Sequence, residues 1–139
     1  MTFTQSISSV FSKYATFSGR ASRSEYWYFV LFNFIISCVI SAIACAQIPF
    51  DTIVMNNPTG FYLSVWQAMP AWASTVMSLY SLAVILPSLT VAVRRLHDTG
   101  RGGGWIFINL VPFIGSIWFL ILTVLPSQYG DNRFGPQPE

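Results

Sequence analysis

Charged residues are scarce in this chain of 139 residues. Asp, Glu, Lys and Arg make up 9% of the sequence, whereas about 25% is usual for a soluble domain. Hydrophobic residues contribute 53% and aromatic residues 17%. A soluble fold of this length has too little interior to bury so much apolar surface, whereas a bilayer solvates it. The shortage of charge therefore argues against an ordinary soluble domain and predicts a protein that crosses the membrane more than once.

Cysteine and histidine are also rare. The chain has two cysteines, Cys38 and Cys45, and one histidine, His97. On one helix the two cysteines would lie about 10 Å apart, too far for a disulfide, so we interpret them as packing residues. One histidine without a neighbouring cysteine or a carboxylate cluster does not predict a metal site, and no cofactor is expected. The net charge of +2 is too small to predict nucleic-acid binding.

Charge is absent from three long apolar runs. A helix needs about 20 apolar residues to cross a bilayer, which places the expected membrane segments at residues 26–46, 72–93 and 105–125. The third run has Pro112 and Gly115 near its middle. It either crosses the membrane with a kink or turns back as a re-entrant hairpin, and we favour the crossing.

Residues 1–18 lack the long apolar core of a signal peptide. Apolar residues instead recur there at steps of three and four, as in an amphipathic helix. Such a helix either lies in the membrane interface or packs on the protein itself, and we adopt the interfacial alternative. Residues 126–139 form a turn-rich polar tail. The expected fold is thus one all-α membrane domain, residues 1–139, with three transmembrane helices and an N-terminal interfacial helix.

The few basic residues are unevenly distributed. The connection over residues 47–71 has none, and the tail has Arg133. The other basic residues form two groups of three, one before the first span and one after the second: Lys13, Arg20 and Arg23, then Arg94, Arg95 and Arg101. Because basic loops stay in the cytoplasm, we predict that the N-terminus and the second group are cytoplasmic. The single arginine of the tail does not fix the side of the C-terminus.

The most polar stretch, residues 94–104, lies between the second and third apolar runs. If the second helix continues past residue 93, Asp98 has the helical spacing of a salt bridge with both Arg94 and Arg95. A loop outside the cell between the first two spans would also bring Glu25 to this side. We therefore expect an ion pair between Glu25 and Arg94 or Arg95.

The same stretch offers weak support for catalysis. His97 and Asp98 are adjacent, so they do not face each other as members of a catalytic triad would. The glycine-rich run that follows lacks the Lys-Ser/Thr ending of a P-loop. We favour a structural role with arginines on lipid phosphates, and keep a ligand or proton site and a catalytic site as lesser alternatives.

Three short stretches form a combined pattern. They are Phe17-Ser-Gly-Arg-Ala-Ser-Arg-Ser-Glu-Tyr-Trp27, then Pro87 to Val93 followed by Arg94-Arg-Leu-His-Asp-Thr-Gly-Arg101, and finally Asn132-Arg-Phe-Gly-Pro136. In order and spacing, over about residues 10–138, they resemble a bacterial family of small inner-membrane proteins, the domain of unknown function numbered 805. The resemblance implies an inner-membrane location and this architecture, and it implies no activity. The candidate residues of the pattern are Arg20, Arg23, Glu25, Arg94, Arg95, His97, Asp98, Arg101, Asn132 and Arg133.

Three functional hypotheses follow. The first is a non-enzymatic scaffold, accessory subunit or lipid-interacting module, with membrane lipids, a second copy or another membrane protein as partners. The second is a small transporter or channel component whose polar path is lined by Asn33, Tyr80, His97 and Asp98. The third, which we favour least, is an enzyme acting on lipid head groups through His97, Asp98 and Arg101.

Overall fold

The computed structural model describes residues 1–49, 65 and 67–138. Within these residues all the regular elements are helices, and turns, irregular backbone and one isolated bridge between Asn132 and Gly135 make up the rest. The elements are α1 (Phe3–Ser12), α2 (Arg23–Cys45), α5 (Ala71–Asp98), the 3-10 helix η1 (Gly103–Leu110) and α6 (Ile114–Val124). They belong to two compact units, which are described separately: residues 1–32 with 84–139, and residues 33–83. The predicted all-α class is confirmed for the described residues.

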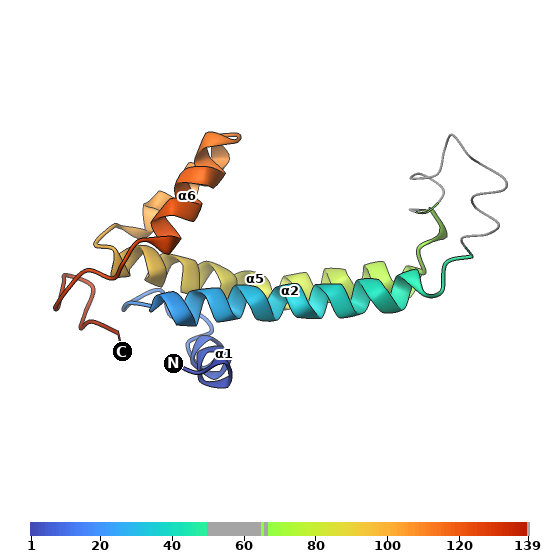
Figure 1. Ribbon diagram of the computed structural model, residues 1–139, viewed down its shortest axis with the longest axis horizontal. Coiled ribbons are helices and arrows are strands. Elements are labelled where there is room, and N and C mark those ends of the chain that lie inside the picture. The colour runs from blue at the N-terminus through green and yellow to red at the C-terminus, as the bar shows by residue number, and fades with distance from the viewer. Residues whose placement is uncertain (50–64, 66, 139) are drawn as a thin grey trace. The chain divides into compact units, whose positions relative to one another are not determined.

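Helix α1 is shorter than the predicted helix over residues 1–18. A capping box starts it: Gln5 N donates to Thr2 Oγ1, and Thr2 N donates to Gln5 Oε1 at 2.9 Å. Figure 1 shows α1 nearly end-on beside the first turns of α2. Its Val10 is fully buried, and the Phe11 ring packs edge-to-face on Phe29 at 5.8 Å between centroids. The packing alternative is thus realised, and the interfacial location stays a prediction.

Helices α2 and α5 are the two described helices that are long and apolar enough to cross a membrane. Their 23 and 28 residues give lengths of about 35 and 42 Å. Both carry exposed apolar side chains, such as Phe34 at 65% and Leu82 at 68%. Apolar helices with this exposure suit a lipid environment, because water would penalise the same surface.

The ends of these two helices differ slightly from the predicted spans. Helix α2 begins at Arg23 because the Ser22 hydroxyl accepts a hydrogen bond from Glu25 N at 3.2 Å. Helix α5 continues five residues beyond the predicted end, to Asp98. Gly100, at φ 76°, then ends it with a Schellman motif, in which Arg101 N donates to Leu96 O at 3.0 Å.

In the unit formed by residues 33–83, the two helices are linked by polar contacts. Tyr80 Oη donates to Asn33 Oδ1 at 2.7 Å, and Trp72 Nε1 donates to Gln47 Oε1 at 3.1 Å. The Asn33 side chain therefore hydrogen-bonds across a helix interface, as expected for a polar group within an apolar run. Most of the connection over residues 47–71 lies outside the described residues.

The third apolar run, residues 105–125, requires a correction. It is not one helix: η1 ends at Leu110, a turn follows in which Phe113 has φ 61°, and α6 begins at Ile114. The two pieces fold back on each other so closely that a Cβ atom on Gly115 would collide with the carbonyl oxygen of Ile108.

Both ends of this hairpin lie at the C-terminal end of α5. Its start lies close to α5, since a Cβ atom placed on Gly103 would lie 2.8 Å from Val93 Cγ1. Beyond its end, Gln128 N donates to Asp98 O at 2.9 Å. The favoured kinked crossing is therefore not the observed shape, and three spans are not confirmed. The backbone matches the broken, returning alternative. Gly115 permits the close approach of η1 and α6, because it has no Cβ atom.

Candidate functional site

A buried carboxylate, Asp98, organises the polar end of the first unit. It is 0% exposed and lies in the last turn of α5. Arg20 Nε donates to its Oδ1 at 3.0 Å, and Arg95 Nη1 donates to its Oδ2. Ser127 Oγ also donates to Oδ2, at 2.5 Å. Of the two expected helical partners of Asp98, the structure therefore selects Arg95, three residues earlier.

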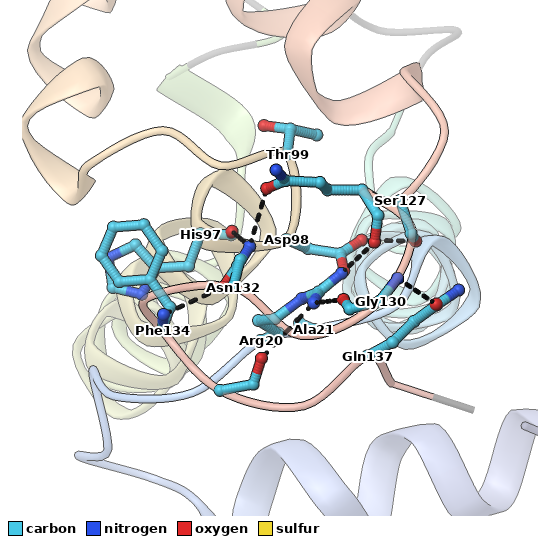
Figure 2. Close-up of polar contacts among 12 residues, drawn as sticks. Arg20, Ala21, His97, Asp98, Thr99, Ser127, Gly130, Asn132, Phe134 and Gln137 are labelled. Atoms are coloured by element: carbon cyan, nitrogen blue, oxygen red, sulfur yellow. Dashed lines mark hydrogen bonds and ion pairs between the residues drawn. The ribbon is translucent and has the colours of Figure 1, made fainter.

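The two arginines that bind Asp98 also donate hydrogen bonds to backbone carbonyls at the end of α6 and beyond it. Arg95 Nε donates to Thr123 O at 3.0 Å, and its Nη2 donates to Leu125 O. Arg20 donates through Nη2 to Gln128 O and through Nη1 to Gly130 O, each at 2.6 Å (Figure 2). The last carbonyls of a helix lack partners within the helix, so Arg95 caps α6. Arg20 in turn fixes the tail against the start of α2.

A second buried ion pair joins α2 and α5. Arg94 Nη1 lies 2.8 Å from Glu25 Oε1, and both side chains are 1% exposed. Ser9 Oγ of α1 donates to the same oxygen at 3.0 Å. The expected pair with Glu25 is present, and Arg94 forms it. The carboxylate thereby connects three helices of this unit.

His97 lies at the edge of the cluster. Its Nδ1 is 3.1 Å from Gly19 O, and its ring stacks on Phe134 with centroids 3.9 Å apart. Asn132 Nδ2 donates to the backbone carbonyl of His97 at 3.0 Å, and Asn132 Oδ1 accepts from Phe134 N (Figure 2). These contacts hold the tail on the end of α5. His97 and Asn132 thus position the tail through these contacts.

The other predicted site residues stand apart from the buried charges. Arg23 is exposed and Arg101 is half-buried, and among the described residues neither side chain joins an ion pair of the cluster. Arg133 is exposed, with its guanidinium 4.6 Å from the centre of the Phe134 ring. The structure thus brings together Arg20, Glu25, Arg94, Arg95 and Asp98, with His97 and Asn132 beside them.

The ion pairs of this cluster cross-link segments of the first unit. Each carboxylate of the cluster is neutralised by at least one guanidinium, and His97 is held by a backbone carbonyl and an aromatic ring. Within the described residues, no group of three or more His, Cys, Asp or Glu is placed to hold a metal ion. Asn33 and Tyr80 of the proposed polar path are hydrogen-bonded to each other.

Sequence reasoning missed several partners in this site. Ser9 and Ser127 carry no distinguishing signal among the many serines of the chain. The carbonyl acceptors of Thr123, Leu125 and Gln128 carry none either, since every residue has a carbonyl. The sequence placed Gly130 and Gly135 in a turn-rich polar tail but did not show which turns they form. Their φ angles of 72° and 132° show why glycine stands there.

Comparison of the sequence with known proteins places the chain in a family. The inner membrane protein YhaI of Escherichia coli K12 is 38% identical over 131 residues, which cover 94% of this chain and 92% of YhaI. The inner membrane protein YhaH of the same organism is 33% identical over 130 residues, covering 94% and 93% of the two chains. The uncharacterised protein YiiR matches over 92 residues at 29% identity, 51% of this chain and 60% of YiiR. No solved structure matches the chain.

The family model described as protein of unknown function (DUF805) matches residues 14–136. This range includes all ten candidate residues, the two long apolar helices and the returning hairpin. The match agrees with the resemblance drawn from the three sequence stretches. The chain belongs to the DUF805 family of proteins of unknown function.

Proposed function

We propose that this protein is a non-enzymatic component of the bacterial inner membrane, a scaffold or accessory subunit that presents a fixed hairpin to a partner protein. The observation that carries the proposal is that both buried carboxylates of the cluster are bound by side chains of the protein itself. Asp98 is bound by Arg20, Arg95 and Ser127, and Glu25 by Arg94 and Ser9. A catalytic or transport site needs polar groups that face a substrate, whereas both of these carboxylates face guanidinium and hydroxyl groups of the same chain.

Composition and relatives support the proposed location. The names of YhaI and YhaH place those proteins in the inner membrane. The most apolar stretches of helices α2 and α5 have mean hydropathies of 2.3 and 2.0, and 11% and 28% of these stretches are buried. We place both helices across the bilayer. The basic residues near their polar ends put these ends in the cytoplasm.

The hairpin of η1 and α6 fits a re-entrant segment. Eight residues of 3-10 helix and eleven of α-helix each span about 16 Å. This is roughly half of a hydrocarbon core of about 30 Å. Both ends of the hairpin lie at the end of α5, so the proposal places the C-terminus on the cytoplasmic side with the N-terminus.

The hairpin tip supports the choice of a protein partner. Leu110 is 79% exposed, Val111 48% and Phe113 86%. The backbone between the two helices is irregular there, and irregular backbone at membrane depth is tolerated when protein covers it. A membrane helix of another protein is therefore the proposed neighbour of this tip.

The side of the tail is tested by cysteine labelling. Cys38 and Cys45 are replaced by alanine, and cysteine is placed at Gln137, which is exposed. We expect protection from an impermeant thiol reagent in intact cells and reaction after the membrane is opened. Labelling from outside intact cells would place the tail outside and reject the re-entrant topology.

The scaffold role is tested by the native size of the protein purified in mild detergent from its own host. We expect a complex that contains this chain and a second membrane protein, and loss of that protein when Phe113 is replaced by aspartate. A homo-oligomer with a central polar seam would favour transport instead. A monomer with a turnover that vanishes in His97→Ala would favour an enzyme, and either result contradicts the proposal.

A further inference from the structure

One buried cation in the first unit has unused hydrogen-bond donors. The Arg94 side chain is 1% exposed, and its Nη1 atom is bound to Glu25. Its Nε and Nη2 atoms are buried without a hydrogen-bond partner in the described part of the chain. Unsatisfied donors on a buried charged group are unfavourable, because they have lost water and gained nothing in exchange. A missing acceptor is therefore expected next to Arg94.

A cavity adjoins this residue. Its volume is about 480 Å³, within the range of about 300–1,000 Å³ that is usual for small-molecule sites. Three basic side chains, Lys13, Arg20 and Arg94, contribute to its lining, whereas Glu25 is the acidic lining residue. Thr16 and Ser18 add hydroxyl groups. The tail residues 136–138 form another part of the wall.

The charges of this lining are unbalanced in favour of an anion. Glu25 is paired with Arg94, and Arg20 is paired with Asp98, which lies outside the cavity lining. Lys13, half-buried at the end of α1, adds a further positive charge. A guanidinium and an ammonium that approach one cavity from different helices suit an anion with several acceptor oxygens pointing in different directions.

We propose that this cavity binds a phosphate group, held by the Nε and Nη2 donors of Arg94 and by the ammonium of Lys13. The group is either the head-group phosphate of an anionic lipid or a free phosphate ion. The inference uses the contacts of the first unit, and it does not depend on the scaffold role proposed above. It gives a function to Arg94 beyond its pairing with Glu25.

Binding is measured by calorimetry on the full-length protein in a non-ionic detergent. The probes are inorganic phosphate, dihexanoyl phosphatidic acid and, as a phosphate-free control with the same chains, dihexanoylglycerol. Arg94→Lys retains a cation for Glu25 but removes the two unpartnered donors. Lys13→Ala removes the second cation of the site. Arg23→Ala is the matched control, because this exposed cation lies near the cavity in sequence but does not line it.

We expect a phosphate-bearing probe to bind, with affinity reduced about tenfold to hundredfold in Arg94→Lys and in Lys13→Ala, as for loss of a charge-assisted hydrogen bond. Arg23→Ala should bind like the unaltered protein. Binding of the lipid alone identifies a head group, binding of the ion alone identifies free phosphate, and binding of both identifies the shared group. The proposal is overturned if neither probe binds, if dihexanoylglycerol binds as well, or if both variants keep full affinity.

Discussion

Arg20 precedes the first long helix, yet its guanidinium lies 3.0 Å from the carboxylate of Asp98, the last residue of the second. Both side chains are completely buried. The same guanidinium donates to the carbonyls of Gln128 and Gly130 in the tail. One arginine therefore joins three segments that are far apart in the sequence. These contacts tie the polar end of the unit together.

Neutralising Asp98 should destabilise the protein strongly. Asp98→Asn leaves the buried guanidiniums of Arg20 and Arg95 without their shared anion. Loss of one partner from a buried ion pair costs about 3–5 kcal/mol. We expect a decrease of this size in the free energy of unfolding, measured by denaturant titration in detergent. Asp131→Asn is the control, since this exposed side chain should change stability by less than about 0.5 kcal/mol. Equal effects of the two changes would argue against the central role of Asp98.

Glu25 and Arg94 should be energetically coupled. Glu25→Gln and Arg94→Gln each leave one buried charge unpaired, whereas the double variant leaves none. We therefore expect the double variant to lose about 1–3 kcal/mol less than the sum of the single losses. The measurement is a double-mutant cycle on the free energy of unfolding. Additive losses, or a Glu25→Gln variant as stable as the original, would show that the pair contributes nothing.

The close approach inside the hairpin can be tested with two glycines. Gly115→Ala places a Cβ against the carbonyl of Ile108, whereas a Cβ on Gly104 meets nothing within 4 Å. Forcing a methyl group into a packed contact costs about 1–3 kcal/mol. We expect Gly115→Ala to lower the thermal midpoint in detergent and Gly104→Ala to leave it nearly unchanged. The reverse order would mean that η1 and α6 do not pack as described.

The hydrogen bond between Tyr80 and Asn33 should contribute modestly. Tyr80→Phe removes the hydroxyl that lies 2.7 Å from Asn33 Oδ1. Hydrogen bonds of this kind between membrane helices average about 0.6 kcal/mol and reach about 1.7 kcal/mol. We expect a loss of stability in that range, measured by the same denaturant titration. Tyr129→Phe serves as the comparison because Tyr129 is 94% exposed. Indistinguishable results would remove the energetic role of the contact.

Part of the fold was accessible from the sequence because its signals are local. The two uncharged runs that became α2 and α5 are long enough to cross a bilayer, and hydropathy reveals them without knowledge of the fold. The ion pair of Glu25 also followed from connectivity, since the start of one helix and the end of the next share a side. The choice of Arg94 over Arg95 did not follow.

The sequence alone determined which segments are apolar and where the charges gather, because hydropathy and helix signals depend on neighbouring residues. Tertiary structure decided that residues 105–125 return instead of running on, since the fold depends on Gly115 meeting the Ile108 backbone. It also decided the partners of Arg20 and Arg95, because many of them are carbonyls without a side-chain signature. Burial of these charges makes such pairings specific, since each unpaired group inside the fold would carry a large desolvation cost.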